Sequence, residues 1–257
     1  MINNIIDFHT HPLYDFHKDT HGVEIDNNRF KNDLLENGIS CACGSVIYKA
    51  TSNRPVTEYE TLIPLLNDQA LCIQKELVEF YVPGIHVHPA FPKLSCNEIE
   101  RCYVKGVRLI GELVPYMMGW NRCADQSFIE IMEYAQELDM VVNIHPTSIP
   151  DMYEFSKALP KLKIVWAHLS GYGGFKEHLD IMKKYENVFF DISAHGTDCD
   201  GTLRYAIDKV GKDRLLYGSD YPGVGPISNK AAVLYENLSS SELEAIFYNN
   251  AKNLLSI

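Results

Sequence analysis

Eight short apolar runs, separated by longer polar segments, constrain the fold of this chain more than any other feature. The runs are rich in Val and Ile, and near-continuous apolar runs are typical of strands that are covered on both faces. They read NIIDF, SCACGSVIY, VPGIHVH, VRLIGEL, MVVNIH, KIVWAH, VFFDIS and RLLYGSD, at residues 4–8, 40–48, 82–88, 107–113, 140–145, 163–168, 188–193 and 214–220. The sequence therefore predicts eight buried strands.

Segments with apolar residues at helical spacing lie between these runs. Residues 125–139 begin with Asp125, a favourable N-cap, and place Phe128, Ile131 and Met132 on one face. Further helices are predicted within residues 57–81, 150–162, 175–186, 202–211 and 240–255. Strand–helix alternation of this kind predicts a parallel sheet, and the count of eight matches a closed (β/α)₈ (TIM) barrel that fills residues 1–257 as a single domain. A doubly wound open sheet is the alternative, and the lack of a Gly-rich phosphate turn after the first run disfavours it.

Composition restricts the partners of the chain. The 257 residues are 46% hydrophobic, which is enough for a full core, and the formal net charge is −11. A chain this acidic has no broad attraction for phosphate backbones or anionic membranes, so we expect no nucleic acid and no membrane as a partner. A small-molecule substrate is expected, and a homo-oligomer remains open.

The sequence also indicates a cellular compartment. It shows no signal peptide and no apolar stretch long enough to span a bilayer. Its seven cysteines are odd in number and lack paired C-x-x-C spacing. Reduced thiols in a cytoplasmic protein are therefore expected, rather than a disulfide framework.

Ionisable residues gather at the ends of the predicted strands. They are His9, His11, His86, His88, Glu112, His145, His168, Asp191, His195 and Asp220. In a (β/α)₈ barrel the carboxyl ends of all strands meet at one face, where active sites are built. Residues that lie scores of positions apart in the sequence are therefore expected to converge there.

The pair His9 and His11 has a particular meaning at the end of a strand. Side chains at i and i+2 point the same way, so both imidazoles face the barrel mouth a few ångströms apart. A divalent cation accepts both nitrogens, and zinc prefers nitrogen ligands plus a carboxylate with one position left for water. His145 and Asp220 could complete that set. A lone H-x-H is a weak signal, as the second such pair at His86 and His88 shows. The prediction rests on the combination of the first pair with single histidines at the ends of the fifth and sixth strands and Asp220 at the end of the eighth.

These segments together resemble the amidohydrolase superfamily, and within it the amidohydrolase 2 branch. The resemblance lies in IIDFHTHPLYD, VVNIHPTS, IVWAHLSGYGG, VFFDISAH, RLLYGSDYP and the C-terminal LEAIFYNNAKNLLSI, which follow the order of the family nearly end to end. It implies a barrel with a metal at its mouth, held by His9, His11, His145 and Asp220. The metal is expected to be zinc, and the site is expected to hold one ion or two.

The resemblance leaves two positions open. His168 matches a histidine that either binds a second metal or acts as acid/base and polarises the substrate. Glu112, in IGELVPY, resembles the strand-four glutamate that bridges two ions in binuclear relatives, including the TatD-type nucleases. In the mononuclear branch this position need not be a ligand, and a salt bridge or an N-cap contact is the alternative for Glu112.

This constellation predicts hydrolysis of an amide, ester or lactone bond in a small molecule by a metal-activated water. Asp220 is expected to take the proton of that water, and His168 to stabilise the developing oxyanion. His86, His195 and Arg122 are candidates for substrate binding. Two other reactions stay open on the same barrel: a nonhydrolytic carboxy-lyase that removes CO2, and a TatD-like metal-dependent nuclease.

Overall fold

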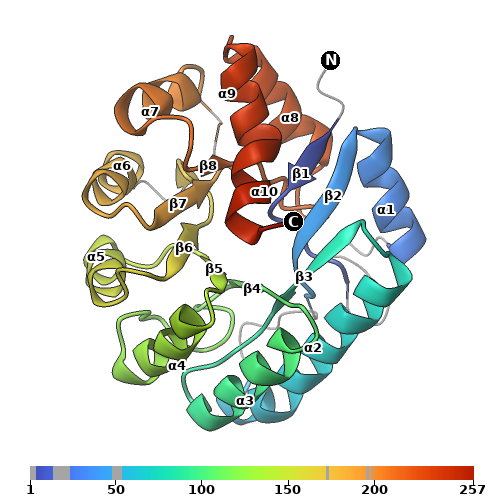
Figure 1. Ribbon diagram of the computed structural model, residues 1–257, viewed down its shortest axis with the longest axis vertical. Helices are drawn as coiled ribbons and strands as arrows, with labels where there is room; N and C mark the ends of the chain where they lie inside the picture. The colour runs from blue at the N-terminus through green and yellow to red at the C-terminus, as the bar shows by residue number, and fades with distance from the viewer. Residues whose placement is uncertain (1–3, 14–23, 48–53, 172–173, 195–196, 198) are drawn as a thin grey trace.

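The computed structural model has one sheet of eight parallel strands, in the order β1 to β8 (Figure 1). It describes residues 4–13, 24–47, 54–171, 174–194, 197 and 199–257. The strands are β1 Ile5–Asp7, β2 Ile39–Ser45, β3 Tyr81–Ile85, β4 Leu109–Leu113, β5 Val141–Ile144, β6 Lys163–Trp166, β7 Val188–Asp191 and β8 Leu215–Leu216. Each overlaps one of the apolar runs, although β2 and β3 begin one residue earlier, at Ile39 and Tyr81, and this confirms the predicted parallel (β/α)₈ architecture.

Backbone hydrogen bonds join the last strand segment to the first and so close the barrel. The Phe8 amide donates to the Tyr217 carbonyl at 2.9 Å, and the Asp220 amide donates to the His9 carbonyl at 2.8 Å. The His11 amide donates to the Tyr221 carbonyl at 2.7 Å. Because of this closure, the two ends of the sequence bring His9 and Asp220 side by side at the barrel mouth.

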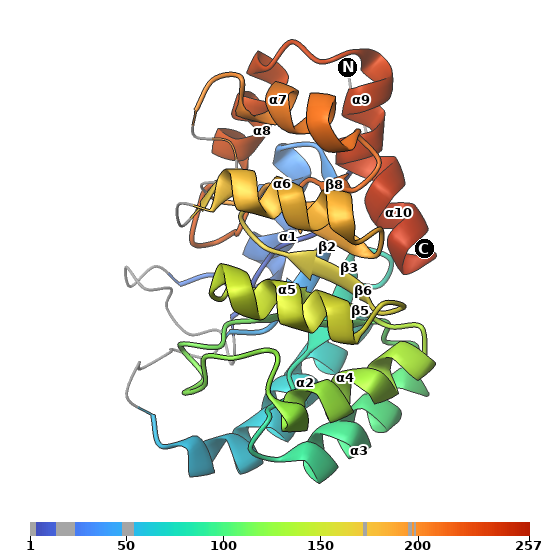
Figure 2. The same ribbon diagram turned by 90° about the vertical axis from the view of Figure 1, so that its left-hand side faces the viewer.

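The helices form a layer outside the strands (Figures 1 and 2). They are α1 Asn27–Glu36, α2 Tyr59–Glu76, α3 Pro92–Tyr103, α4 Gln126–Glu137, α5 Ile149–Ala158, α6 Phe175–Lys184, α7 Thr202–Val210, α8 Pro226–Tyr235, α9 Ser240–Glu244 and α10 Asn250–Leu255, the last two joined by a π-helical turn at Ala245–Asn249. The predicted helical segments match α2, α4, α5, α6, α7 and the α9–α10 region. Asp125 occupies the N-cap of α4, although its side chain makes no capping hydrogen bond.

Three helices went unpredicted, α1, α3 and α8. Two of them, α3 and α8, begin with a proline at the first position, where a missing amide hydrogen costs nothing. The third, α1, is capped by Asp26, whose side chain accepts from the Arg29 amide at 2.8 Å. These start signals are local, and the apolar stripes that follow are short, so helical periodicity alone does not reveal them.

The core has two parts that together decide where a site can form. The larger part packs the outward faces of the strands against the helices. The smaller part fills the barrel interior with residues such as Ile6, Leu109, Val141 and Val165, and α10 adds Leu254 to it. The C-terminal helix therefore closes the amino-terminal end of the barrel, and the carboxyl end is left for polar side chains.

All seven cysteines are free, as the sequence predicts. In the described part of the chain, every helix is too short or too polar to cross a membrane.

Candidate metal centre

The His9 and His11 rings follow β1 and meet at the barrel mouth. Both are buried, and their Nε2 atoms lie 3.1 Å apart. Nδ1 of His9 lies 2.9 Å from a carboxylate oxygen of Asp191, and Nδ1 of His11 lies 3.0 Å from the Ser45 carbonyl. Since these oxygens only accept hydrogen bonds, each Nδ1 carries the hydrogen and each Nε2 is left to face a cation.

Glu112, on β4, divides its carboxylate between two pairs of imidazoles. Its Oε2 lies 3.3 Å from Nε2 of both His9 and His11. Its Oε1 lies 3.1 Å from Nδ1 of His145 and 3.5 Å from Nε2 of His168. The side chain is 5% exposed. The carboxylate thus separates four histidines into two groups, each of which faces one oxygen.

The spacing of these atoms matches the coordination shell of a small divalent ion. Ligand atoms at about 2.0–2.2 Å from a tetrahedral zinc lie about 3.3–3.6 Å from one another. His9, His11 and Glu112 offer three atoms at 3.1–3.3 Å from one another, at or slightly below this spacing, and Glu112, His145 and His168 offer a second set. The residues present therefore fit a divalent metal, and they fit it in two places.

Asp220 adds a further oxygen on the side of the first pair. Its Oδ1 lies 3.6 Å from Nε2 of His11 and 3.8 Å from Nε2 of His9. Its side chain is 25% exposed, far more than the side chains of Glu112 and His9. Asp220 is therefore placed between the buried cluster and solvent at the barrel mouth.

The electrostatics of the cluster call for positive charge. Burial opposes ionisation of Glu112, but the surrounding imidazoles of His9, His11, His145 and His168 outweigh it and hold the pKa of Glu112 well below its usual value. Burial lowers the pKa of His9, yet the neighbouring carboxylates raise it well above the ordinary value. A buried carboxylate group of this kind is stable only with protons or cations among the imidazoles.

Backbone geometry holds two of these side chains in uncommon conformations. His168 and Asp220 have φ angles of 56° and 67°, in the left-handed region that residues with a Cβ rarely adopt. Gly218 lies against the first histidine, because a Cβ built there would meet the His9 Cβ at 2.7 Å. The strand end before Asp220 therefore approaches His9 as closely as a glycine allows.

Of the three residues predicted to bind substrate, His86 and Arg122 lie outside this cluster. Nε2 of His86 lies 2.9 Å from the Val46 carbonyl, and burial is the main cause that lowers the pKa of His86 to about 4. The Arg122 guanidinium pairs with acidic residues, donating to Glu154 at 2.8 Å, and is 53% exposed. His195 lies outside the described residues.

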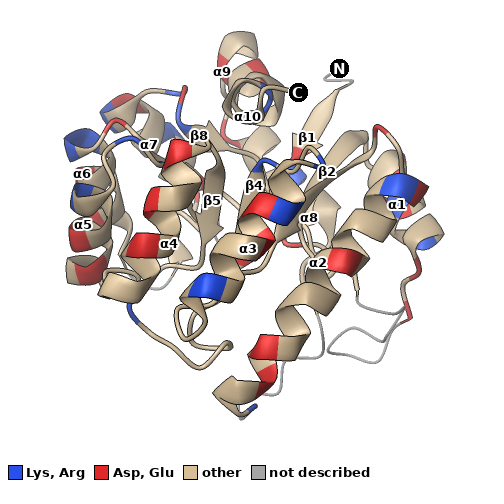
Figure 3. Ribbon diagram, turned by 60° about the horizontal axis from the view of Figure 1, so that its bottom comes forward, with Lys and Arg blue, Asp and Glu red and all other residues tan. Residues whose placement is uncertain are grey.

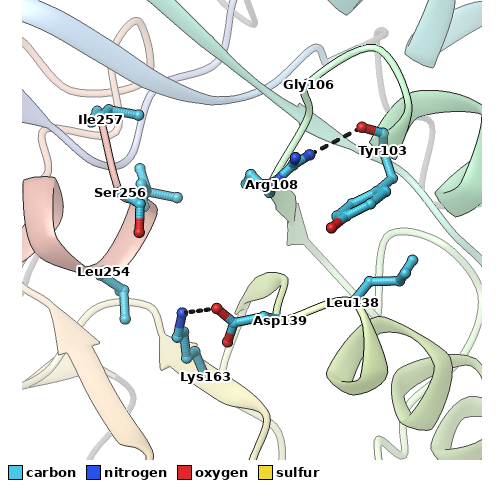
Figure 4. A pocket seen from close by; sticks show the side chains of 10 residues that line it. Tyr103, Gly106, Arg108, Leu138, Asp139, Lys163, Leu254, Ser256 and Ile257 are labelled. Atoms are coloured by element: carbon cyan, nitrogen blue, oxygen red, sulfur yellow. Dashed lines mark hydrogen bonds and ion pairs between the residues drawn. The ribbon is translucent and has the colours of Figure 1, made fainter.

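A hollow at the opposite end of the barrel contains a further arginine, Arg108. Arg108 precedes β4 and lies beside Tyr103 in a hollow of about 310 Å³, next to Lys163 and the C-terminal Ile257 (Figure 4). Its guanidinium donates to the Tyr103 carbonyl at 3.0 Å and packs on the Tyr103 ring.

Two polar residues that support the cluster were not recognised from sequence. Ser193 contacts the His9 and His168 rings, and Asn143 donates to Asp191 at 2.8 Å. Asp191 itself, at the end of β7, forms hydrogen bonds with His9 and Asn143. The D-x-S spacing of Asp191 and Ser193 on one strand is the signal that could have indicated them, since residues at i and i+2 share a face.

Comparison with known proteins gives a consistent result. The family model described as Amidohydrolase matches residues 6–257. No curated protein matches the chain. A 2,6-dihydroxybenzoate decarboxylase from Rhizobium superposes with a TM-score of 0.79 at 15% identity, covering 99% of each chain.

Two further solved structures are similar and hold manganese. A dihydroxybenzoic acid decarboxylase from a Polaromonas species, with manganese and the inhibitor 2-nitroresorcinol, has a TM-score of 0.76 at 16% identity, covering 99% of this chain and 97% of that chain. A 5-carboxyvanillate decarboxylase from Novosphingobium aromaticivorans, also with manganese, has a TM-score of 0.68 at 18% identity, covering 89% of this chain and 80% of that chain. At these identities the likeness shows a shared fold.

Proposed function

The chain belongs to the amidohydrolase family, and from this premise we propose that it is a metal-dependent hydrolase that cleaves an amide, ester or lactone bond in a small molecule. The observation that carries the proposal is the division of the Glu112 carboxylate between two pairs of histidines. A carboxylate shared in this way suits two divalent ions held close together. His9 and His11 would hold one ion with Asp220, and His145 and His168 would hold the other.

The ions, when bound, would supply an acidified water and a Lewis acid for the substrate carbonyl. The protein residues do the rest. Asp220 has the most exposed carboxylate of the cluster, and we assign it the proton of the attacking water, which it then passes to the leaving group. Asp191 and the Ser45 carbonyl keep the His9 and His11 rings in orientation while this happens.

The mouth of the barrel offers a surface for the body of a substrate. Tyr116 follows β4, is 54% exposed, and its ring meets the His145 ring edge-on with centroids 5.2 Å apart. Met117, beside it, is 38% exposed. We assign these two side chains to apolar contact with the substrate next to the second pair of histidines.

Decarboxylation is the second candidate, and the names of the similar solved structures favour it. Three of them are named as decarboxylases of hydroxylated benzoates, and two of these hold manganese. A carboxy-lyase of this kind would use an arginine to hold the substrate carboxylate. Arg122, the arginine predicted to bind substrate, is engaged by Glu154 and Asp125 instead. We therefore place hydrolysis first.

A nuclease reading has less support. The formal charge is −11, and acidic and basic side chains are mixed over the outer helices in the view of Figure 3. Such a surface gives a long polyanion little electrostatic attraction.

Isotope incorporation distinguishes the two leading reactions. The metal-loaded protein is incubated in H2¹⁸O with a panel of amides, esters, lactones and hydroxylated benzoates, and products are weighed by mass spectrometry. Hydrolysis places one ¹⁸O atom in the product acid. Release of CO2 from a benzoate, with no ¹⁸O in the aromatic product, would replace the proposed hydrolase by a decarboxylase.

A further inference from the structure

Asp191 is a fully buried carboxylate whose two oxygens are both occupied by donors. Oδ2 lies 2.9 Å from Nδ1 of His9 and accepts from Asn143 at 2.8 Å. Oδ1 accepts from the backbone amides of His168 and Ser193, at 3.2 and 3.1 Å, and from the Ser193 hydroxyl. A carboxylate with this many donors can only accept, so it dictates which neighbouring atoms carry hydrogen.

The direction of the Ser193 hydrogen follows from this. The hydroxyl has one hydrogen, and Asp191 Oδ1 requires it. The Ser193 oxygen is then left with lone pairs, and Nδ1 of His168 lies 2.9 Å away. Nδ1 of His168 must therefore carry a hydrogen and donate it, so its Nε2, 3.5 Å from Oε1 of Glu112, is the ring nitrogen without a hydrogen.

The same carboxylate thus acts on both sides of Glu112. It fixes His9 directly and His168 through Ser193, and these two rings belong to different histidine pairs. We propose that Asp191 and Ser193 are positioning residues that keep hydrogen on Nδ1 of His9 and His168, so that both Nε2 atoms are presented to cations. The inference rests on the proposed metal centre for its purpose, but the hydrogen positions can be measured without metal.

Substitution of Ser193 is expected to affect one of the two rings, and substitution of Asp191 to affect both. Ser193→Ala removes the hydroxyl that accepts the hydrogen of His168 Nδ1. The backbone carbonyl of residue 193, 3.3 Å from Nδ1, remains as a more distant acceptor. His9 keeps its Asp191 partner in this variant, because the Ser193 oxygen is only a second contact at 3.1 Å. Asp191→Asn replaces one acceptor oxygen by an amide donor and therefore disturbs both rings.

Nuclear magnetic resonance of protein with ¹⁵N-labelled histidine tests the hydrogen positions in the metal-free chain. We expect a slowly exchanging hydrogen on Nδ1 of both His9 and His168. In Ser193→Ala the His168 signal should shift upfield and exchange faster while the His9 signal stays; in Asp191→Asn both should change. Ser156→Ala and Asp151→Asn are matched controls, since both residues are buried and hydrogen-bonded in and around α5. Hydrogen on Nε2 alone, at either ring, would overturn the proposal.

Competition with a chromophoric chelator, using zinc alone, tests whether Asp191 and Ser193 support metal binding. Supporting residues of metal-binding histidines are worth about 10–100-fold in metal affinity. We expect Ser193→Ala to weaken one of two bound ions by that factor and Asp191→Asn to weaken both, with Ser193→Thr restoring the affinity. Unchanged zinc affinity in Ser193→Ala overturns the positioning role. A wild-type chain that binds no zinc overturns the proposed function instead, and the Nδ1 signals still decide the hydrogen positions.

Discussion

Nε2 of His9 faces Nε2 of His11 across 3.1 Å, while the Nδ1 atom of each ring is bound to an oxygen acceptor. Two nitrogen lone pairs at this distance repel each other unless a positive charge lies between them. Burial lowers the pKa of His9, but the carboxylates of Asp191 and Glu112 raise it well above its ordinary value, so a proton can supply this charge. With Glu112 3.3 Å from both atoms, a divalent cation meets the same demand with better geometry.

Asp220→Asn should lower kcat by about 10²–10⁴-fold, because the amide cannot take the proton of the attacking water. The melting temperature should stay close to that of the wild type, since the Asp220 side chain is partly exposed. Asp213→Asn is the matched control, with an exposed carboxylate paired to Lys212. A variant with near-native kcat on a true substrate would show that Asp220 is not the base.

Glu112→Gln should lose bound metal. Each histidine pair faces one carboxylate oxygen of Glu112, and the amide of glutamine has only one oxygen. Elemental analysis after dialysis is expected to show a fall toward zero ions per chain. Glu98→Gln serves as the control: Glu98 is equally buried and is paired with Arg101 and Asn67. Full metal content in Glu112→Gln would remove Glu112 from the ligand set.

His86 should make the protein less stable in mild acid. Its pKa in the folded chain is lowered to about 4, chiefly by burial, so the unfolded chain takes up the proton first as pH falls. The contribution of neutral His86 is complete above about pH 6.5 and is lost between about pH 6.5 and 4, amounting to about 3 kcal/mol.

Urea unfolding of wild type and His86→Gln, both treated with chelator, measures this loss. The free energy of unfolding of the wild type should fall more steeply between pH 7 and 4. Parallel curves would mean that His86 becomes protonated in the folded chain.

Gly218→Ala should displace His9, because the added Cβ would lie 2.7 Å from the His9 Cβ and 3.0 Å from the Ser193 Cβ. Overpacking of this kind costs about 1–3 kcal/mol of stability, and zinc affinity should fall with it. Gly225→Ala is the control, since nothing lies within 4 Å of a Cβ at that position. Equal zinc affinity in the two variants would show that the close approach has no role in the centre.

The barrel could be predicted from sequence because each strand is a nearly continuous apolar run with polar residues at its end. Strands covered on both faces leave this pattern, and closure then follows from the count. The helices α3 and α8 were missed because a proline at the first turn and a short apolar stripe give a weak periodic signal. The packing of α10 against the amino-terminal end of the barrel could not be predicted, because no local sequence signal shows which helix covers that end.

The candidate centre was partly accessible from sequence. The i and i+2 rule placed His9 and His11 together, and barrel geometry placed Asp220 beside them. The division of Glu112 between two histidine pairs depends on the rotation of one side chain, which spacing does not fix. The contacts of Ser193 and Asn143 with the cluster depend in the same way on packing across the barrel.

The most direct test of the shared carboxylate is X-ray diffraction from zinc-soaked crystals, measured on both sides of the zinc absorption edge. Two anomalous peaks about 3.5–4 Å apart are expected, as in other two-metal sites, one beside His9 and His11 and the other beside His145 and His168, with Glu112 between them. A single peak, or peaks away from Glu112, would contradict the account.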